Sequence, residues 1–233
     1  MLDWLTADRP HDELAARHAS GWLALHLPEV DALYGVPQTA AHHPEICTGA
    51  HIELCLEVAA ELTTEFDVRF AVLTHDLGKA LTPRDEWPKH VNHEHAGLTP
   101  LADVCARLEV PASAQRLARL VCEWHLHAHR AFEMGDASVV KFFMNTGMDL
   151  DAELARGYLL ACESDKRGRL GRKNTDYRQG AFLRAVRTVL LEHPYPEGIT
   201  MQHPAGNRIH QARVQAVKQL RASFGSPADI SHC

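Results

Sequence analysis

The chain of 233 residues is long enough for one sizeable core or two small domains, and its composition of 45% hydrophobic and 23% charged residues is ordinary for a globular protein. The formal net charge of −6 excludes a global basic field, so an RNA or nucleotide partner would have to contact local Lys and Arg residues. No apolar stretch approaches the ~18 residues of a membrane span, and the N-terminus lacks the basic and apolar regions of a signal peptide. We therefore expect a cytoplasmic protein without membrane contact.

The cysteines give no sign of a metal site, whereas the histidines do. The 6 cysteines form no CxxC pair, which argues against a thiolate zinc site or a disulfide framework. The 17 histidines are unusual, and many of them gather at 42–51, 75–95 and 125–129. This clustering is a compositional indication of metal chemistry.

Hydrophobic periodicity predicts an all-α fold, with no convincing strand and no repeat. We expect one domain over residues 1–233, with a core at about 22–222, an N-terminal helical extension at 1–21 and a frayed polar tail at 223–233. The expected helices lie at about 49–62, 67–77, 98–108, 114–126, 136–145, 178–192 and 206–222, and another leads to Asp165. Helix 206–222 could seal this core or form the interface of a homodimer, and the sequence leaves both alternatives open.

Helix 49–62 brings the first candidate ligand. Its buried stripe is expected to consist of Ile52, Cys55, Leu56 and Ala59. His51 borders this stripe near the start of the helix, and Thr48 is expected to cap the first turn through its hydroxyl. Taken alone, His51 reads better as a histidine hydrogen-bonded at the top of a helix bundle. It becomes a ligand candidate only together with the residues below.

His75 and Asp76 close an apolar run that begins near Val68, and Gly78 is expected to end the helix there. Polar groups at the edge of a core need partners, and a metal ion satisfies an imidazole and a carboxylate at once. Neighbouring residues on a helix diverge by about 100°. The pair could therefore hold one ion only near a helix end, or two ions with Asp76 as a bridge.

Further candidate ligands follow along the chain. The loop 80–97 could lie across the site and supply His90 or His93. His125 lies beside the apolar stripe of helix 114–126, and Asp165 continues the apolar face of its own helix. Histidine and carboxylate ligands without thiolates suit Mn, Fe, Ni, Co or Zn, and carboxylates also suit Mg; such a set favours a catalytic ion over a structural one.

A basic loop, residues 166–173, follows Asp165 directly. One interpretation is a solvated connector. The interpretation that we favour is a phosphate-binding lip, because the planar guanidinium of Arg matches the oxygens of a phosphate group.

The spacing of His51, His75-Asp76 and Asp165 resembles the H…HD…D signature of the HD-domain metal-dependent phosphohydrolases. Longer stretches resemble the C-terminal HD domain of bacterial CCA-adding enzymes (tRNA nucleotidyltransferases): His43-Pro44-Glu45-Ile46, Asp67-Val68-Arg69-Phe70-Ala71, Leu81-Thr82-Pro83 and Leu117-Ala118-Arg119-Leu120-Val121. The resemblance covers roughly residues 22–222. It implies an HD-domain helical bundle and metal-dependent hydrolysis of 2′,3′-cyclic phosphates, 2′-phosphates and other phosphomonoesters of nucleotides or RNA ends, by attack of a metal-activated water on phosphorus.

The resemblance also implies roles for individual residues. The metal ligands would be His51, His75, Asp76 and Asp165, with His93 and His125 as ligands of a second ion or as proton donors. Asp76, Lys79 and His125 would be catalytic, and Arg69, Lys79, Arg167 and Arg169 would contact the substrate. The cofactor would be Mn, Ni, Co or Mg, as one ion or two. For Lys79 and Arg69 the alternative is a solvent-exposed charge near a helix end.

Two departures from the family pattern bear on function. The pattern carries an acid where Cys47 stands, and nothing in residues 1–35 resembles the nucleotidyltransferase half. We therefore expect a stand-alone phosphohydrolase and no CCA addition. The alternatives are a (deoxy)nucleoside monophosphate phosphatase with the same metal site and a non-catalytic tRNA- or RNA-binding remnant, since a fold does not fix a substrate.

Overall fold

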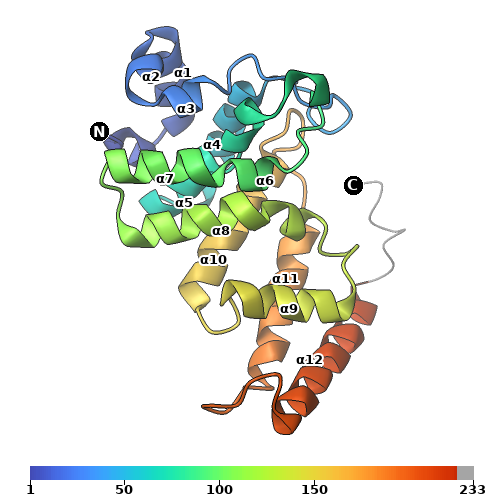
Figure 1. Cartoon of the computed structure of the whole chain (residues 1–233). Coiled ribbons are helices and arrows are strands. Elements are labelled where there is room, and N and C mark those ends of the chain that lie inside the picture. The colour runs from blue at the N-terminus through green and yellow to red at the C-terminus, as the bar shows by residue number, and fades with distance from the viewer. Residues whose placement is uncertain (225–233) are drawn as a thin grey trace. The chain divides into compact units, whose positions relative to one another are not determined.

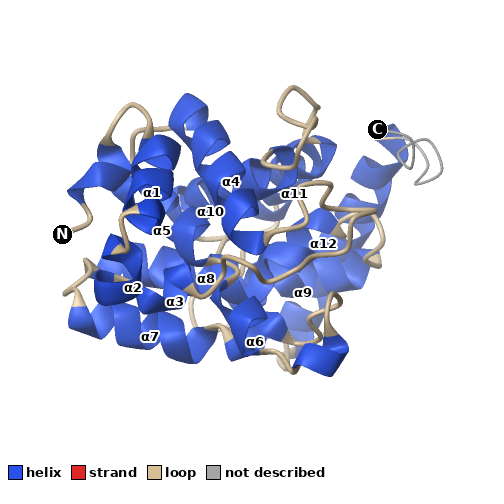
Figure 2. Ribbon diagram, turned by 90° about the horizontal axis from the view of Figure 1, so that it is seen from above, coloured by secondary structure: helices blue, strands red, loops and turns tan. Residues whose placement is uncertain are grey.

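The computed structural model describes residues 1–224, which fold into helices joined by loops (Figures 1 and 2). In chain order the elements are η1 (Asp3–Thr6), α1 (Pro10–Ala19), α2 (Trp22–His26), α3 (Pro28–Asp31), α4 (Thr48–Leu62), α5 (Phe66–Thr74), η2 (Leu77–Leu81), η3 (Arg84–Glu86), α6 (His93–Ala96), α7 (Leu98–Arg107), α8 (Ala112–His129), α9 (Asp136–Thr146), α10 (Ala152–Arg167), α11 (Arg178–Leu191) and α12 (Pro204–Ser223). Residues 1–224 contain no strand, only an isolated antiparallel bridge between Pro37 and Cys47. The predicted all-α fold is confirmed. From residue 225 on, the tail expected to fray lies outside the described residues.

The predicted buried stripe of α4 is confirmed, because Ile52, Cys55, Leu56 and Ala59 are each 0% exposed. The predicted cap is wrong. Thr48 is the first residue of α4, and its hydroxyl donates to the carbonyl oxygen of Val36 at 3.0 Å instead of accepting from the first turn. Cys47 holds the cap position, and its Sγ accepts from the backbone N–H of Gly35 at 3.3 Å. Both side chains thus fasten the preceding loop to the start of the helix.

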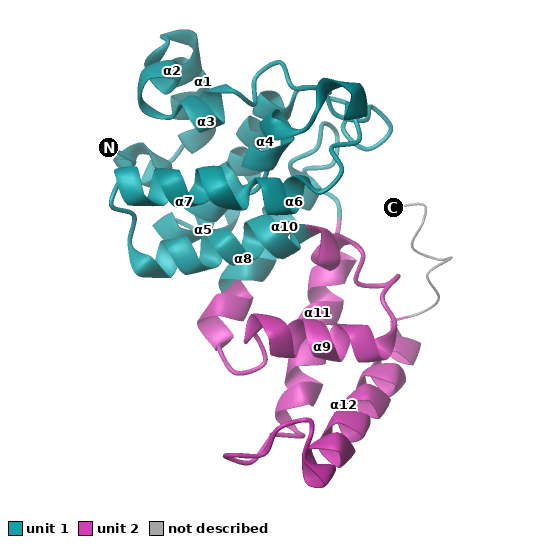
Figure 3. Ribbon diagram, in the orientation of Figure 1, with its two compact units in different colours: residues 1–125, 157–175 teal, residues 126–156, 176–233 magenta. Residues whose placement is uncertain are grey.

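The chain divides into two compact units (Figure 3). Unit 1 consists of residues 1–125 and 157–175, and unit 2 of residues 126–156 and those from 176 on. In unit 2, α12 packs against α9 and α11. The side chains of α12 that face its neighbours are therefore covered within the unit, as the core-sealing alternative expects. The organisation as one domain and a homodimer both remain predictions.

In unit 1, α1 packs against α4, and α4 packs against α5. Leu5 and Leu14 are each 0% exposed, so residues of the expected N-terminal helical extension at 1–21 pack within this unit. Within residues 1–224, no helix combines the length and the apolar character that crossing a membrane requires.

Arg69 on α5 joins the N-terminal segment to this core. Its side chain is buried, and Nη1 donates to the carbonyl oxygens of Leu5 at 2.8 Å and Ala7 at 2.7 Å. Nε donates to the carbonyl oxygen of Thr63 at 2.8 Å. With its donors satisfied by backbone carbonyls, Arg69 has a structural role. The expectation that Arg69 contacts a substrate phosphate is corrected accordingly, and so is the alternative of a solvent-exposed charge.

The substitution Arg69→Met keeps much of the side-chain volume but removes every one of these hydrogen bonds. Because the buried carbonyl oxygens would then lack donors, we expect the free energy of unfolding to fall by about 3 kcal/mol. Denaturant unfolding measures the change. Arg130→Met is the control, since Arg130 is exposed in the turn after α8 and forms an ion pair with Glu133 of the same turn. Equal stabilities of the two variants would contradict the structural role of Arg69.

Candidate metal centre

The backbone changes from α to 3₁₀ geometry at the pair His75-Asp76. Helix α5 ends at Thr74, and the chain continues as η2 from Leu77. The pair therefore lies at a helix end, which is where two neighbouring side chains can converge. Gly78, which we expected to end the helix, instead lies inside η2.

The reason for glycine at 78 is a close approach of two elements. A Cβ atom there would lie 1.9 Å from the carbonyl oxygen of His93, the first residue of α6. Only a residue without a side chain allows η2 and α6 to come this close. The contact brings His93 next to Asp76, so the glycine positions the site and does not terminate a helix.

A first group of side chains that could hold a metal comes from three parts of unit 1. His51 lies on α4, His75 follows the last residue of α5, and Asp165 lies on α10. The Nε2 atom of His51 lies 3.1 Å from Oδ1 of Asp165, and Nε2 of His75 lies 3.8 Å from the same oxygen. All three residues are buried. Residues that are far apart in the sequence thus converge as the spacing predicted.

A second group joins Asp76 to His93 from α6 and His125 from α8. Oδ1 of Asp76 lies 3.3 Å from Nε2 of His93 and 3.8 Å from Nε2 of His125. The two Nε2 atoms are 3.4 Å apart. All three side chains are buried. The segment 80–97, which we expected to be a loop, contains η3 and α6 and contributes His93, one of the two alternatives expected.

The other alternative, His90, is engaged elsewhere. Its Nδ1 lies 2.6 Å from the hydroxyl of Thr82, and its Nε2 lies 2.7 Å from the carbonyl oxygen of Pro37. With both ring nitrogens occupied, His90 fastens the loop to the segment at Pro37 and is not a candidate ligand.

Asp76 belongs to both groups through its two carboxylate oxygens. Oδ1 faces His93 and His125, whereas Oδ2 lies 3.2 Å from Nε2 of His75. Presenting one oxygen to each group is the geometry of a bridging carboxylate, the role that the sequence suggested for this residue.

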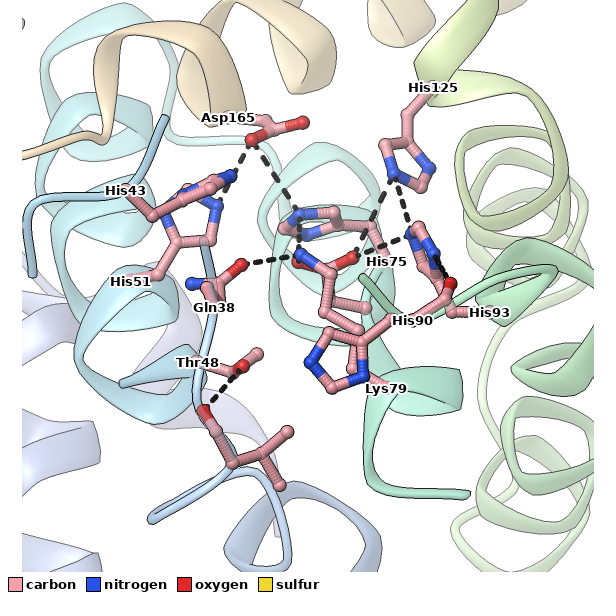
Figure 4. A network of polar contacts seen from close by, with 12 residues as sticks. Gln38, His43, Thr48, His51, His75, Lys79, His90, His93, His125 and Asp165 are labelled. Atoms are coloured by element: carbon pink, nitrogen blue, oxygen red, sulfur yellow. Dashed lines mark hydrogen bonds and ion pairs between the residues drawn. The ribbon is translucent and has the colours of Figure 1, made fainter. Parts of the chain in front are cut away.

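All four histidines present the same ring nitrogen to the cluster (Figure 4). In each of them, Nδ1 faces a backbone carbonyl oxygen. For His51 this oxygen belongs to Gly168 (3.1 Å), and for His75 to Val72 (2.8 Å). For His93 it belongs to His90 (2.9 Å), and for His125 to Val121 (3.1 Å). A carbonyl oxygen only accepts, so each Nδ1 carries the proton. Each Nε2 is thereby left to coordinate a metal, which is the arrangement usual around metal-bound histidines.

The unsatisfied atoms of the cluster test whether a metal fits. Nε2 of His75 and Oδ1 of Asp76 are buried and have no hydrogen-bond partner among residues 1–224. Leaving such atoms unpaired costs roughly 1–3 kcal/mol each. A divalent cation between the two groups would satisfy both, and the imidazole and carboxylate donors suit Mn, Fe, Ni, Co or Zn. The residues present fit a metal centre.

Charge within the cluster is strongly coupled. Burial opposes the charged form of His75, but the carboxylates of Asp76 and Asp165 outweigh it and raise the pKa of His75 to about 9. Burial lowers the pKa of His125 well below its ordinary value. Burial also opposes the charge of Asp76, yet His75 and Lys79 hold the pKa of this carboxyl well below its usual range. The carboxylate of Asp76 is therefore ionised and attracts cations, and a metal ion bound at Nε2 of His75 would displace the second ring proton that Asp76 and Asp165 favour.

Lys79 is one such cation. It is 8% exposed, and its Nζ donates to Oδ2 of Asp76 at 2.6 Å and to Oε1 of Gln38 at 2.5 Å (Figure 4). The alternative of a solvent-exposed charge is wrong. A buried ammonium is thus held directly against the carboxylate of Asp76.

The basic loop 166–173 is held by ion pairs. Nη1 of Arg167 donates to Glu163 at 2.9 Å, and its Nε donates to the carbonyl oxygen of Lys173 at 2.8 Å. Arg167 therefore shapes the loop, which differs from the substrate contact that we expected. Arg169 is half-buried, and its Nε has no hydrogen-bond partner among residues 1–224. Arg169 therefore carries a buried donor that no described residue engages.

Glu45 and His43 extend the cluster, although only their resemblance to the family motif drew attention to them in the sequence. Oε1 of Glu45 lies 2.9 Å from Nδ1 of His43 and 3.1 Å from Nδ1 of His51. Its Oε2 accepts from the backbone N–H of Leu170 at 3.1 Å. Burial opposes the charge of Glu45, but hydrogen bonds from both histidines lower its pKa. Glu45 thus orients a ligand and fastens the basic loop at once.

Comparison with known proteins agrees with this geometry. The HD domain family matches residues 48–179. The multifunctional CCA protein of Stenotrophomonas maltophilia (strain K279a) is 43% identical over 221 residues, which is 93% of this chain and 54% of that protein. The multifunctional CCA protein of Alkalilimnicola ehrlichii is 40% identical over 228 residues, covering 96% of this chain and 55% of that protein. No solved structure matches the chain.

The chain spans about half the length of the curated relatives that it matches. The family match includes α4, the His75-Asp76 pair and Asp165, which carry the signature seen in the sequence. Both the fold and the matched region lead to one conclusion: this chain belongs to the HD domain family.

Proposed function

We propose that this chain is a metal-dependent phosphohydrolase that opens 2′,3′-cyclic phosphates and removes 2′-phosphates or other phosphomonoesters on nucleotides or RNA ends. One observation carries the proposal: Asp76 presents one carboxylate oxygen to each of two buried histidine groups. Such a site suits one or two divalent ions, with Mn, Ni, Co and Mg as the candidates.

His51, His75, Asp76 and Asp165 would hold one ion, and Asp76 with His93 and His125 would hold a second. A divalent ion bound there supplies a water molecule of lowered pKa and neutralises charge that develops on the phosphoryl oxygens. In the hydrolysis, the water oxygen forms a bond to phosphorus, the bond from phosphorus to the ribose oxygen breaks, and that ribose oxygen gains a proton.

We propose different roles for His125 and Lys79. The Nδ1 of His125 donates to a carbonyl oxygen and burial disfavours a second ring proton, so Nε2 acts as a ligand and not as a proton donor. Lys79 uses one donor on Asp76 and one on Gln38, which leaves a third for a phosphoryl oxygen or the leaving oxygen. Arg169 supplies an additional phosphate contact through its unpaired Nε.

The relatives favour RNA ends within this substrate class. They are named multifunctional CCA protein, and this chain, which covers about half of each, resembles the HD domain of CCA-adding enzymes (tRNA nucleotidyltransferases). A nucleoside monophosphate phosphatase would use the same cluster, and a non-catalytic RNA-binding remnant would not need it. The intact burial of all six ligating side chains favours an enzyme over the remnant.

The function is tested by hydrolysis of 2′,3′-cyclic AMP with Mn, Ni, Co and Mg in turn. We expect the wild-type protein to hydrolyse it with at least one of these metals and to lose activity with EDTA. Asp76→Asn keeps the shape of the side chain but removes its charge, and we expect turnover to fall roughly 1,000-fold or more because the bridge between the two groups is lost.

The control is Asp103→Asn, an exposed aspartate on α7 that should leave turnover unchanged. Full activity of Asp76→Asn would contradict the proposal. Turnover of nucleoside monophosphates but not of the cyclic substrate would select the phosphatase alternative, and a folded protein that binds RNA but neither metal nor cyclic substrate would select the remnant.

Metal affinity should depend on Glu45. Glu45→Ala removes the carboxylate that holds Nδ1 of His51, and we expect the affinity for Mn²⁺ to fall about 10- to 100-fold, as is usual when such an orienting partner is lost. Glu45→Gln retains an amide oxygen that accepts from the imidazole, so its loss should be smaller. Isothermal titration calorimetry measures the affinity, with Glu86→Ala on exposed η3 as the control. Wild-type affinity in Glu45→Ala would show that the Gly168 carbonyl alone orients His51.

A further inference from the structure

Gln38 lies one hydrogen bond away from the bridging carboxylate, and nothing in its sequence context singled it out. Its side chain is 3% exposed, and Oε1 accepts from Nζ of Lys79, which also donates to Asp76. An ammonium group can only donate, so the amide oxygen must be the atom that faces Lys79. The orientation of the Gln38 amide is thereby fixed, and its nitrogen points away from Lys79 (Figure 4).

The amide nitrogen has no acceptor. Nε2 of Gln38 is buried and makes no hydrogen bond within residues 1–224. Buried donors in proteins are nearly always paired, so an open one beside a candidate active site needs an explanation. A residue whose sole task was to hold Lys79 would not need an amide, since a carboxylate would hold an ammonium more strongly.

The backbone around Gln38 is fixed, so the donor is presented by a rigid segment. The backbone N–H of Gln38 donates to the carbonyl oxygen of Ile46 at 2.6 Å. The preceding residue is held as well, because Pro37 forms the bridge to Cys47 and its carbonyl oxygen accepts from Nε2 of His90. A donor that is held by its backbone and by Lys79 loses little entropy when it binds a ligand.

We propose that Gln38 is a substrate-binding residue whose Nε2–H donates to a non-bridging oxygen of the substrate phosphate, while its Oε1 positions Lys79. This inference rests on the proposed function. A phosphate ester bound at the cluster beside Lys79 and Gln38 carries anionic oxygens, the acceptors that pair most strongly with such a donor. Gln38 thus adds a neutral donor to the charged contacts of Lys79 and Arg169.

Two substitutions separate the two ends of the amide. Gln38→Glu keeps an acceptor for Lys79 but has no donor to offer, whereas Gln38→Met removes both. Gln211→Glu, at an exposed position on α12, controls for the added charge. The probe is inorganic phosphate, titrated by calorimetry into the manganese-loaded full chain, together with the KM for 2′,3′-cyclic AMP and the manganese content of each variant.

We expect both Gln38 variants to keep the wild-type manganese content and to bind phosphate roughly 10- to 100-fold more weakly, the range for a hydrogen bond to a charged group. The KM should rise in parallel. Gln211→Glu should match the wild type.

Several results would overturn the inference. Weaker binding in Gln38→Met alone would limit Gln38 to holding Lys79, and weaker binding in Gln38→Glu alone would reveal only a charge effect. Unchanged binding in both variants, loss of manganese in step with loss of phosphate, or a wild-type protein that binds no phosphate would also refute it. Failure of the proposed function gives a different result: the wild-type protein would bind phosphate but hydrolyse no ester. In that case the phosphate titration still decides the role of Gln38.

Discussion

The site depends on one buried carboxylate that must satisfy partners on two sides. Asp76 is 1% exposed, and its two oxygens face different histidine groups while Lys79 pairs with one of them. Burying an ionised carboxylate is costly unless cations and donors surround it. Several features of the fold place such partners around Asp76. The end of α5 supplies His75, the close approach of η2 and α6 supplies His93, and α8 supplies His125.

Backbone carbonyls carry much of this organisation. Each of the four cluster histidines donates its Nδ1 proton to a carbonyl oxygen, three of them to a carbonyl a few residues earlier in the chain. Local backbone geometry therefore fixes which nitrogen of these three histidines faces inward, and long-range packing has only to bring the segments together. His51 is the exception, since its carbonyl partner belongs to Gly168 after α10. Its orientation couples the first ligand to the basic loop, and Glu45 strengthens that coupling.

The candidate ligands could be predicted because they leave a signal in the sequence. His51 and His75-Asp76 border apolar runs, and a polar group at the edge of a core stands out against hydrophobic periodicity. Helix boundaries followed from the same periodicity, and most agree closely with the structure. The predicted cap at Thr48 was wrong, because the carbonyl oxygen of Val36, which accepts from the Thr48 hydroxyl, lies in a loop whose path no local rule predicts.

The roles of Arg69, Gln38 and Glu45 could not be predicted from the sequence. The carbonyl partners of Arg69 include Leu5 and Ala7, far away in the sequence, so its charge looked available for a substrate. Gln38 and Glu45 lie in a loop without periodicity, and their importance comes from contacts with Lys79 and His51 that only the folded chain creates. Side chains that act through other side chains leave little trace in a single sequence.

The central claim is that the two histidine groups around Asp76 form one metal centre. Anomalous scattering from crystals of the protein grown with Mn²⁺ tests it directly. The account predicts a manganese peak within coordination distance of His51, His75, Asp76 and Asp165, with a second, if present, between Asp76, His93 and His125. Crystals saturated with manganese that show no peak next to Asp76 would contradict it.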